Sequence, residues 1–261
     1  MGIDTSRYRV RLARTDSEVR AAQRLRYEVF IRELGGDGPG VDHAAGLERD
    51  EFDRVALQLL LFDTHRPGAP EDQVVGAYRL LPGDIAAEFG RFYCDGEYDL
   101  APLRATGRRL LELGRSCVSA AYRGGPAMFL LWNALADFVL ENRIEILFGV
   151  ASFHGTDIES LRLPLSWLHR NHLAPEHLRV RALPGGFHSL DLLPGEALDR
   201  TAAMVRMPAL IKAYLRLGGF VGDGAFIDHA FNTTDVLLLM DTAAMSEKHK
   251  GFYTRRFEGQ A

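Results

Sequence analysis

The order of elements between residues 110 and 169 constrains the fold of this chain more than any other sequence feature. Residues 110–119 form a strong apolar strand pattern, which a short glycine-containing loop at 121–125 follows. A helix is predicted from Pro126 to about residue 143, because proline suits the first helical position. A buried strand at 146–153 and a helix from about 157 to 169 complete the series. This succession indicates an α/β (α+β) fold.

The N-terminal half adds three strands and one helix. Residues 8–13 alternate in a strand-like way. Asp16 is expected to cap a helix with apolar residues at helical spacing: Val19, Ala22, Leu25, Val29 and Phe30. A glycine-rich loop at 35–46 follows this helix. Apolar strands are predicted at 55–62 and 74–81, and the turn between them, at 66–72, predicts an antiparallel pair.

The C-terminal quarter changes in pattern more than in composition. A basic amphipathic helix and a last strand at 236–240 follow residue 193. We therefore predict one domain over residues 1–195 and, over 196–261, a C-terminal extension packed on the same core. A separately folding domain of about 65 residues is the alternative.

Composition excludes several classes of function. The net charge of −4 over 261 residues gives no bulk basic field, so nucleic-acid binding is not expected. Cys94 and Cys117 are too few for a disulfide framework or a zinc ribbon, which favours a reducing compartment. Residues 1–14 lack the apolar core of a signal peptide, and no apolar run is long enough to span a bilayer. We expect a cytoplasmic protein that meets a membrane only from the surface.

Arg123, Gly124 and Gly125 lie between a predicted strand and a predicted helix. Backbone amides at a helix N-terminus can cradle a phosphate, and glycines let the phosphate approach closely. A tight turn is the alternative for such a short motif. Its position between these two elements favours the phosphate interpretation.

Glu48, Asp50 and Asp53 place three carboxylates within six residues, directly after the glycine-rich loop. Such a group can bind a cationic amine, ligate a hard metal or solvate a loop. A calcium loop is excluded, because the central glycine and the terminal glutamate are missing at the required spacing.

Glu112 and Arg115 are charges in an otherwise apolar strand. Three positions apart, they are expected to point to opposite faces. Buried charges are costly unless they are paired or functional. The sequence leaves both interpretations open, with Arg26, Arg79 or one of the acids as ion-pair partners.

Two further enzyme classes do not fit. His169, His172 and His177 match no helical zinc motif, and no cysteine pair lies nearby, so no metal is expected. Ser116, Ser119 and Ser152 do not form a G-x-S-x-G elbow, which argues against a serine hydrolase. The H-x-x-x-x-D pattern associated with glycerolipid acyltransferases is absent as well.

The spacing of these charged residues resembles the acyl-homoserine-lactone synthases, a branch of the GNAT superfamily that uses acyl carrier protein thioesters. The matching residues are Arg26 with Phe30, Glu48-x-Asp50-x-x-Asp53, Arg79 and Glu112-x-x-Arg115. Seven other segments resemble a sister group, the L-ornithine N-alpha-acyltransferases of ornithine-lipid synthesis. They are LELGRSCV (111–118), LFGVASF (147–153), GTD (155–157), LHRNHLAP (168–175), LIKAYLRLG (210–218), FVGDG (220–224) and NTTDV (232–236). His154 replaces an expected proline, and Gly124-Gly125 is a short form of the family's phosphate loop.

The resemblance implies a GNAT fold, in which a twisted mixed sheet flanked by helices splays between two central parallel strands, here 110–119 and 145–153. It also implies transfer of a (3-hydroxy)fatty acyl group from acyl carrier protein to the α-amine of L-ornithine, without metal or other cofactor. The alternatives are the same chemistry on lysine, glycine or S-adenosylmethionine, and a non-catalytic GNAT-like module that binds carrier protein or lipid. The short Gly124-Gly125 loop suits phosphopantetheine, which carries one phosphate.

Roles for individual residues follow from the same resemblance. Glu112 would act as general base, braced by Arg115. The backbone N–H groups of Cys117 and Val118 would stabilise the oxyanion. The acidic cluster would hold the δ-ammonium of ornithine. The expected substrate-binding residues are Arg26, Phe30, Glu48, Asp50, Asp53, Arg79 and Ser152, and those for the acyl-pantetheine arm are Arg123, Gly124 and Gly125.

Two surfaces are predicted to meet partners. Acidic acyl carrier protein would dock on a basic surface formed by Arg104, Arg108, Arg109 and Arg123. Residues 207–217 form an amphipathic helix, with Lys212 and Arg216 opposite the apolar side. This helix would rest on the anionic inner membrane, or else face the protein core, because both kinds of helix show this stripe. The apolar residues are Leu210, Ile211, Tyr214, Leu215 and Leu217.

Overall fold

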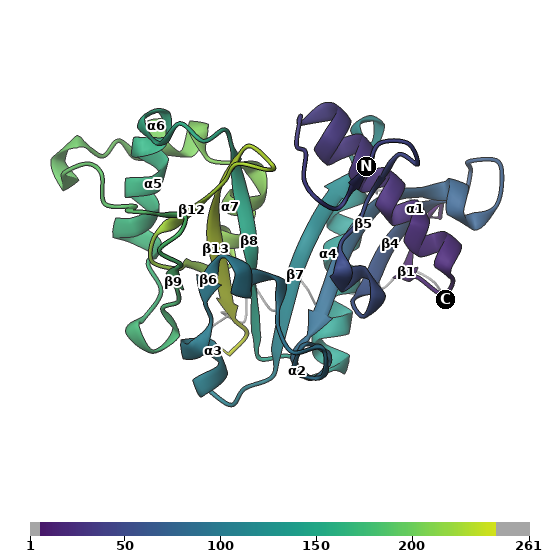
Figure 1. Ribbon diagram of the computed structural model, residues 1–261, viewed down its shortest axis with the longest axis horizontal. Helices are drawn as coiled ribbons and strands as arrows, with labels where there is room; N and C mark the ends of the chain where they lie inside the picture. The colour runs from purple at the N-terminus through teal and green to yellow at the C-terminus, as the bar shows by residue number, and fades with distance from the viewer. Residues whose placement is uncertain (1–5, 244–261) are drawn as a thin grey trace. The chain divides into compact units, whose positions relative to one another are not determined.

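The computed structural model describes residues 6–243, which divide into two compact units. The described part of the first unit comprises residues 6–85 and Leu113–Arg143. That of the second comprises Ala86–Glu112 and residues 144–243 (Figure 1). Each unit carries part of the β-sheet, and strand β7 (Leu110–Val118) contributes its first residues to the second unit and its remaining residues to the first.

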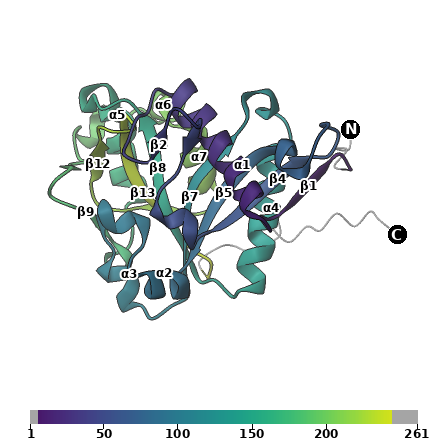
Figure 2. The ribbon, with the colours of Figure 1, turned by 45° about the vertical axis from the view of Figure 1, so that its right-hand side comes forward.

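The first unit is built on strands β1 (Tyr8–Leu12), β4 (Leu57–Asp63), β5 (Val74–Pro82) and β7. β4 pairs antiparallel with β1 and with β5, which confirms the predicted antiparallel pair. The near-continuous apolar pattern of β4 arises because both of its faces are buried. Leu60 packs with the apolar residues of α1 (Asp16–Arg26), whereas Leu61 lies beside Gly76 and Leu131 of α4 (Ala127–Glu141). Figure 2 shows α1 along β4 and β5.

The first helix begins one residue earlier than expected. Thr15, not Asp16, is the N-cap, and its side chain accepts a hydrogen bond from the backbone N–H of Glu18 at 3.3 Å. The helix continues directly into a π-helix, η1 (Tyr27–Glu33). The predicted loop follows, with the short hairpin β2 (Val41–Asp42) and β3 (Leu47–Glu48) and the 3₁₀ helix η2 (Glu51–Arg54).

Gly40 closes this hairpin by backbone contact. Its carbonyl accepts a hydrogen bond from the N–H of Arg49 at 3.0 Å, and an added Cβ would lie 1.8 Å from the Arg49 carbonyl oxygen. We expect Gly40→Ala to destabilise the protein by about 1–3 kcal/mol, because the backbone that leads into Glu48 and Asp50 must shift. Urea unfolding measures the change. Gly185→Ala is the control, since a Cβ there meets nothing within 4 Å; equal effects of both variants would contradict the prediction.

In the second unit, β8 (Ile146–His154) pairs parallel with β7 over Leu110–Glu112. β13 (Thr233–Asp241) runs antiparallel to β8 along its whole length and also pairs with β11 (Phe220–Val221) and β12 (Ala225–Asp228). The mixed sheet flanked by helices and the two parallel strands confirm the predicted fold class. The other strands are β6 (Tyr98–Asp99), β9 (Arg181–Ala182) and β10 (Phe187–His188).

The remaining helices connect these strands. The α-helices are α2 (Gly83–Phe89), α3 (Ala101–Ala105), α5 (Ile158–His172), α6 (Arg200–Arg206) and α7 (Ala209–Arg216). The 3₁₀ helices are η3 (Pro70–Gln73), η4 (Tyr93–Gly96), η5 (Ala120–Tyr122), η6 (Glu176–Leu178) and η7 (Gly195–Ala197). Pro126 is the N-cap of α4 rather than its first helical residue.

The predicted extension supplies α6, α7, β11, β12 and β13 to the second unit. Residues 244–261 of that extension lie outside the described part of the chain. The boundary at residue 195 stays a prediction. Within residues 6–243, no helix has both the length and the hydropathy to cross a bilayer.

The apolar side of α7 faces protein, not a membrane surface. Ile211, Tyr214 and Leu215 are buried, and so is Leu217 directly after the helix. The ammonium of Lys212 donates a hydrogen bond to the carbonyl of Met204 at 3.2 Å. The prediction that residues 207–217 rest on a membrane through these apolar residues is therefore wrong, because the protein itself buries them. The same stripe is explained by core packing.

Candidate functional site

Six of the predicted residues meet in the first unit as one network of ion pairs. α1 supplies Arg26, β5 supplies Arg79 and β7 supplies Arg115. The hairpin and η2 region supply the acids Glu48, Asp50 and Asp53. Three arginines thus face three carboxylates, so the network is formally neutral.

Arg26 is the buried centre of this network, with 0% of its surface exposed. Its two terminal nitrogens donate to the Asp53 carboxylate at 2.8 and 2.5 Å, and Nη2 also donates to the Glu48 carbonyl at 2.7 Å. Arg26 Nε lies 2.6 Å from Glu48 Oε2. Burial opposes the charged guanidinium, but Glu48 and Asp53 outweigh it and raise the pKa of Arg26. The side chain therefore acts as a fixed cation inside the unit.

Arg79 and Arg115 close the network around Asp50. Arg79 Nη1 contacts Asp50 Oδ1 at 2.6 Å, and Arg115 reaches Glu48 Oε1 at 3.0 Å and Asp50 Oδ2 at 3.3 Å. Burial raises the pKa values of Asp50 and Asp53, but the arginines outweigh it and lower both. Both carboxylates are consequently ionised at neutral pH.

Arg115 has an unusual backbone for a residue inside a strand. Its φ of 51° lies in the left-handed region, which costs a non-glycine residue about 1–2 kcal/mol. The side chain of the same residue forms the ion pairs to Glu48 and Asp50. Strain of this kind concentrates at functional sites.

Phe30 and Cys117 belong to the apolar layer beside the network. Phe30 is partly buried in η1 and packs against a core cluster that contains Cys117. Burial raises the pKa of the Cys117 thiol to about 12, so the thiol stays protonated. Any contribution of Cys117 and Val118 to acyl transfer would come from their backbone N–H groups, as predicted.

Glu112 lies in the second unit and has a structural task there. One carboxylate oxygen accepts the backbone N–H of Tyr93 at 2.8 Å, and the other accepts that of Cys94 at 2.6 Å. These donors begin η4 and compensate the burial of Glu112, which is 4% exposed. Burial and then Glu112 and Glu97 raise the pKa of the Cys94 thiol. The base role of Glu112 stays a prediction.

The predicted phosphate loop leaves open space above Gly124. This glycine has a φ of 76°, and an added Cβ would meet nothing within 4 Å. Arg123, however, forms a paired contact with Glu33 of η1, and its Nε donates to the Val118 carbonyl at 2.9 Å. The phosphate interpretation and the tight-turn interpretation of Arg123, Gly124 and Gly125 both fit this loop.

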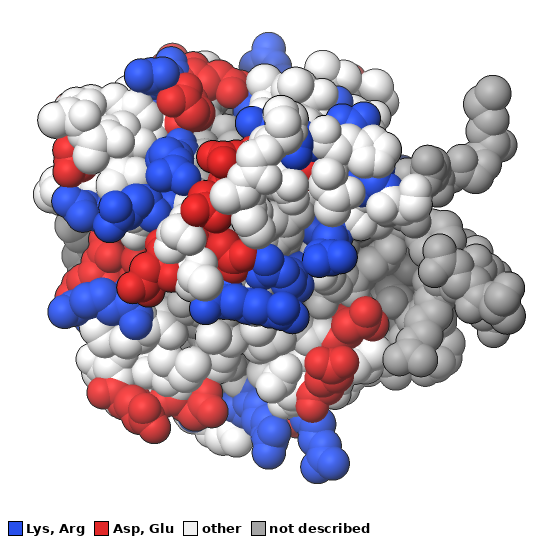
Figure 3. Space-filling model, turned by 90° about the vertical axis from the view of Figure 1, so that its right-hand side faces the viewer, with Lys and Arg blue, Asp and Glu red and all other residues white. Residues whose placement is uncertain are grey.

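Three of the four predicted docking arginines, Arg104, Arg108 and Arg123, already have acidic partners. Arg104 binds Asp95 at 2.5 Å, and Arg108 binds Asp241 at 2.6 Å. Arg104, Arg108 and Arg109 belong to the second unit, whereas Arg123 belongs to the first. Figure 3 shows basic and acidic groups interspersed on one face of the molecule. The structure does not bring the four arginines together within one unit.

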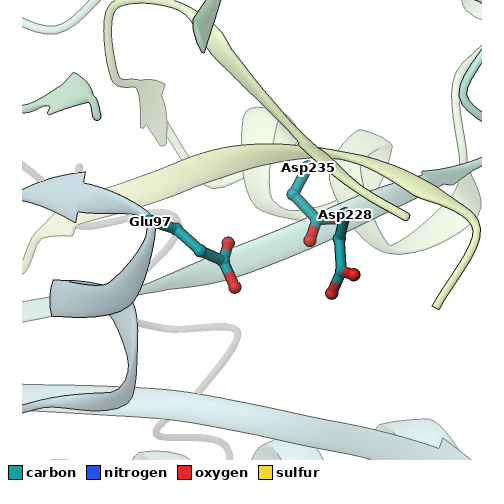
Figure 4. A group of neighbouring side chains, drawn as sticks. All are labelled: Glu97, Asp228 and Asp235. Atoms are coloured by element: carbon teal, nitrogen blue, oxygen red, sulfur yellow. The ribbon is translucent and has the colours of Figure 1, made fainter. Parts of the chain in front are cut away.

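A second carboxylate group was not predicted from sequence. Glu97, Asp228 and Asp235 of the second unit each offer one carboxylate oxygen, and these oxygens lie within 4.8 Å of one another, close enough to hold a metal ion together (Figure 4). Glu97 and Asp235 are buried. More than 130 positions separate the first of these residues from the last, so no local pattern reveals them. The exposed Ser152 pairs in register with Asp235 on β13.

Two glutamines of the first unit were also missed. The side-chain amides of Gln23 and Gln58 donate to Asp53 at 3.2 and 3.3 Å. Gln58 is 2% exposed within the apolar strand β4. A lone glutamine in such a strand is the signal that could have pointed to it.

Comparison with known proteins finds similarity to acyltransferases along nearly the whole chain. Residues 25–133 match the acetyltransferase (GNAT) domain model. The chain is 66% identical over 253 residues to the L-ornithine N(alpha)-acyltransferase of Rhodobacter capsulatus, covering 97% of each chain. It is 40% identical to the enzyme of the same name from Brucella abortus, over 94% of this chain and 88% of that one.

A solved structure shares the fold. The CoA-dependent acyl-homoserine lactone synthase BjaI, solved with MTA, aligns with a TM-score of 0.50 at 15% identity, over 91% of this chain and 81% of that one. This likeness supports the architecture alone. The sequence relatives carry the assignment: the chain belongs to the L-ornithine N(alpha)-acyltransferase family and is an acyltransferase.

Proposed function

We propose that this protein transfers a 3-hydroxyacyl group from acyl carrier protein to the α-amine of L-ornithine, forming lyso-ornithine lipid. The observation that carries ornithine as acceptor is the similarity to named ornithine acyltransferases along nearly the whole chain. The ionised acids of the first unit add a chemical reason, because an acceptor with a second ammonium suits them.

In the proposed reaction, the α-amine attacks the thioester carbonyl directly. The ammonium first gives a proton to a base, for which we propose Glu112 or a water bound to it. A C–N bond forms, the C–S bond breaks, and the pantetheine thiol leaves with a proton. Backbone N–H groups at Cys117 and Val118 would stabilise the oxyanion. No metal, other cofactor or covalent enzyme intermediate is required by this sequence of steps.

Product analysis tests the proposal. Purified protein receives a mixture of 3-hydroxyacyl and unsubstituted acyl carrier proteins with ornithine, lysine, glycine and S-adenosylmethionine, and products are identified by mass spectrometry. We expect N-α-acylornithine from the 3-hydroxyacyl donor. A predominant product from another amine would change the acceptor, and the absence of any acylated amine would favour a non-catalytic binding module.

Glu33 competes with the donor for Arg123 in this proposal. The phosphate of phosphopantetheine would replace the Glu33 carboxylate at the guanidinium. We expect Glu33→Gln to lower the KM for acyl carrier protein about two- to fivefold, the range of an exposed ion pair. Glu28→Gln, which breaks the exposed pair with Arg32 instead, is the control. A higher KM in Glu33→Gln would mean that Glu33 positions Arg123 for binding.

We place the reaction in the cytoplasm at the inner membrane, because the product is a long-chain acyl amino acid of low aqueous solubility. Peripheral contact would be electrostatic, since the apolar side of α7 is buried. Co-sedimentation with anionic and neutral liposomes tests this. Binding that requires anionic lipid and weakens with salt supports it, and a protein that stays in the supernatant contradicts it.

A further inference from the structure

The three carboxylates of the ion-pair network differ in what they can still bind. Asp53 accepts five hydrogen bonds: two from Arg26, one each from the side chains of Gln23 and Gln58, and one from the backbone N–H of Asp50. A carboxylate has about four lone-pair sites. The Asp53 side chain is also only 5% exposed. Asp53 is therefore saturated and closed to a ligand.

Glu48 is closed in a similar way. Its side chain is 2% exposed, with Arg115 at Oε1 and Arg26 at Oε2. Asp50 differs, because 20% of its side chain is exposed. Its Oδ1 accepts Arg79 and the backbone N–H of Phe52 at 2.6 and 2.9 Å, while Oδ2 has one long contact to Arg115 at 3.3 Å. Oδ2 thus keeps both accessibility and acceptor capacity.

The side-chain amide of Gln58 helps to fix the position of Asp53. Its Oε1 is buried without a hydrogen-bond partner among residues 6–243, while its Nε2 serves Asp53. The opposite amide orientation would set an oxygen against the carboxylate. A buried carbonyl oxygen without a hydrogen-bond partner destabilises the fold. The hydrogen bond from Gln58 to Asp53 is the interaction that offsets this cost. Asp53 in turn lies 3.6 Å from Arg79, which holds Asp50.

We infer that Asp50 is the specificity residue that binds the side-chain ammonium of the acceptor, whereas Asp53, Gln23 and Gln58 are positioning residues that fix Arg79 and Asp50 without touching substrate. This inference rests on the proposed function. Asp50 and Asp53 thus have different roles, although the sequence pattern does not distinguish them.

The test compares ornithine with norvaline, which has the same carbon chain but no δ-ammonium. The measured quantity is the ratio of kcat/KM for the two acceptors, ornithine over norvaline. We expect Asp50→Asn to lower this ratio about 10- to 100-fold, the effect of losing a hydrogen bond between charged groups. Asp42→Asn, which changes a carboxylate paired with Arg49 outside the network, is the matched control.

Asp53→Asn and Gln58→Leu should behave differently. Both should raise the KM for the two acceptors by a similar factor, with the ratio unchanged and kcat less affected. A merely structural role would lower the melting temperature without this shift in KM. Gln58→Leu keeps the test decisive if Asp53→Asn does not fold.

The outcomes separate this inference from the proposed function. No acylated amine from the wild type would overturn both. Product formation with a ratio near one in the wild type, or an unchanged ratio in folded Asp50→Asn, would overturn the inference alone. Collapse of the ratio in Gln58→Leu or Asp53→Asn, rather than in Asp50→Asn, would assign the ammonium to Asp53.

Discussion

Arg26→Met is expected to destabilise the protein by about 3–5 kcal/mol, because it leaves buried carboxylates without their cation. Methionine fills much of the arginine volume, so the loss reports charge rather than a cavity. In the variant, Glu48 and Asp53 lose the guanidinium that lies between them. Glu48 keeps its ion pair with Arg115, and Asp53 keeps the longer contact with Arg79. Denaturant unfolding of wild type and variant measures the difference.

Arg24→Met supplies the matched control for this prediction. Arg24 lies in the same helix two positions earlier and is exposed to solvent. Its replacement should change the free energy of unfolding by less than about 0.5 kcal/mol. A loss of under about 1 kcal/mol in Arg26→Met would show that the acids relax or bind protons at little cost.

The same variant should respond differently to acid. The pKa values of Asp50 and Asp53 are lowered in the folded protein, so their stabilising contribution is present above the unfolded values near about 4. It is lost as the pH falls through the lower folded values. Removing Arg26 raises the folded pKa of Asp53, and we expect acid unfolding of Arg26→Met to begin at higher pH. An acid midpoint equal to that of the wild type would contradict this.

The sequence predicted the long strands of the sheet because they are buried apolar runs, but it missed the short strands β10, β11 and β12. Residues 74–81 and 146–153 were each extended by one residue in β5 and β8. The last strand was underestimated, since Thr233 and Thr234 add polar character to a β13 that begins at 233. The π-helix was missed because apolar residues at helical spacing run through Val29 and Phe30 without a visible change of period.

The sequence named the acids as possible partners, which is confirmed for Arg115 with Glu48 and Asp50, but it did not indicate the backbone N–H groups that bind Glu112. The sequence indicated that Glu112 and Arg115 need partners, but those partners lie 18 to 67 positions away. Asp50 and Asp53 looked alike in sequence and differ only through what surrounds them. The amphipathic stripe of α7 likewise specifies an apolar side without specifying what covers it. Tertiary packing decides each of these points.

Glu112→Gln is expected to lower kcat about 10²- to 10⁴-fold if the side chain is the general base. The structure adds a second effect. Both oxygens of Glu112 accept backbone N–H groups, so the amide of glutamine would set a donor against a donor. This mismatch should cost about 1–3 kcal/mol of stability. A fall in turnover is therefore informative only beside a variant with the same structural damage.

Asp95→Asn provides that comparison. Asp95 accepts the backbone N–H of Phe92, the N-cap of η4, at 2.7 Å and also pairs with Arg104 at 2.5 Å, while Glu112 is left intact. Both variants are assayed at a temperature well below their melting temperatures, with saturating donor and acceptor. A kcat for Glu112→Gln at least about 100-fold below that of Asp95→Asn would assign proton removal to Glu112. Equal losses at equal melting temperature would make Glu112 a structural cap of η4, and the base would have to be sought elsewhere.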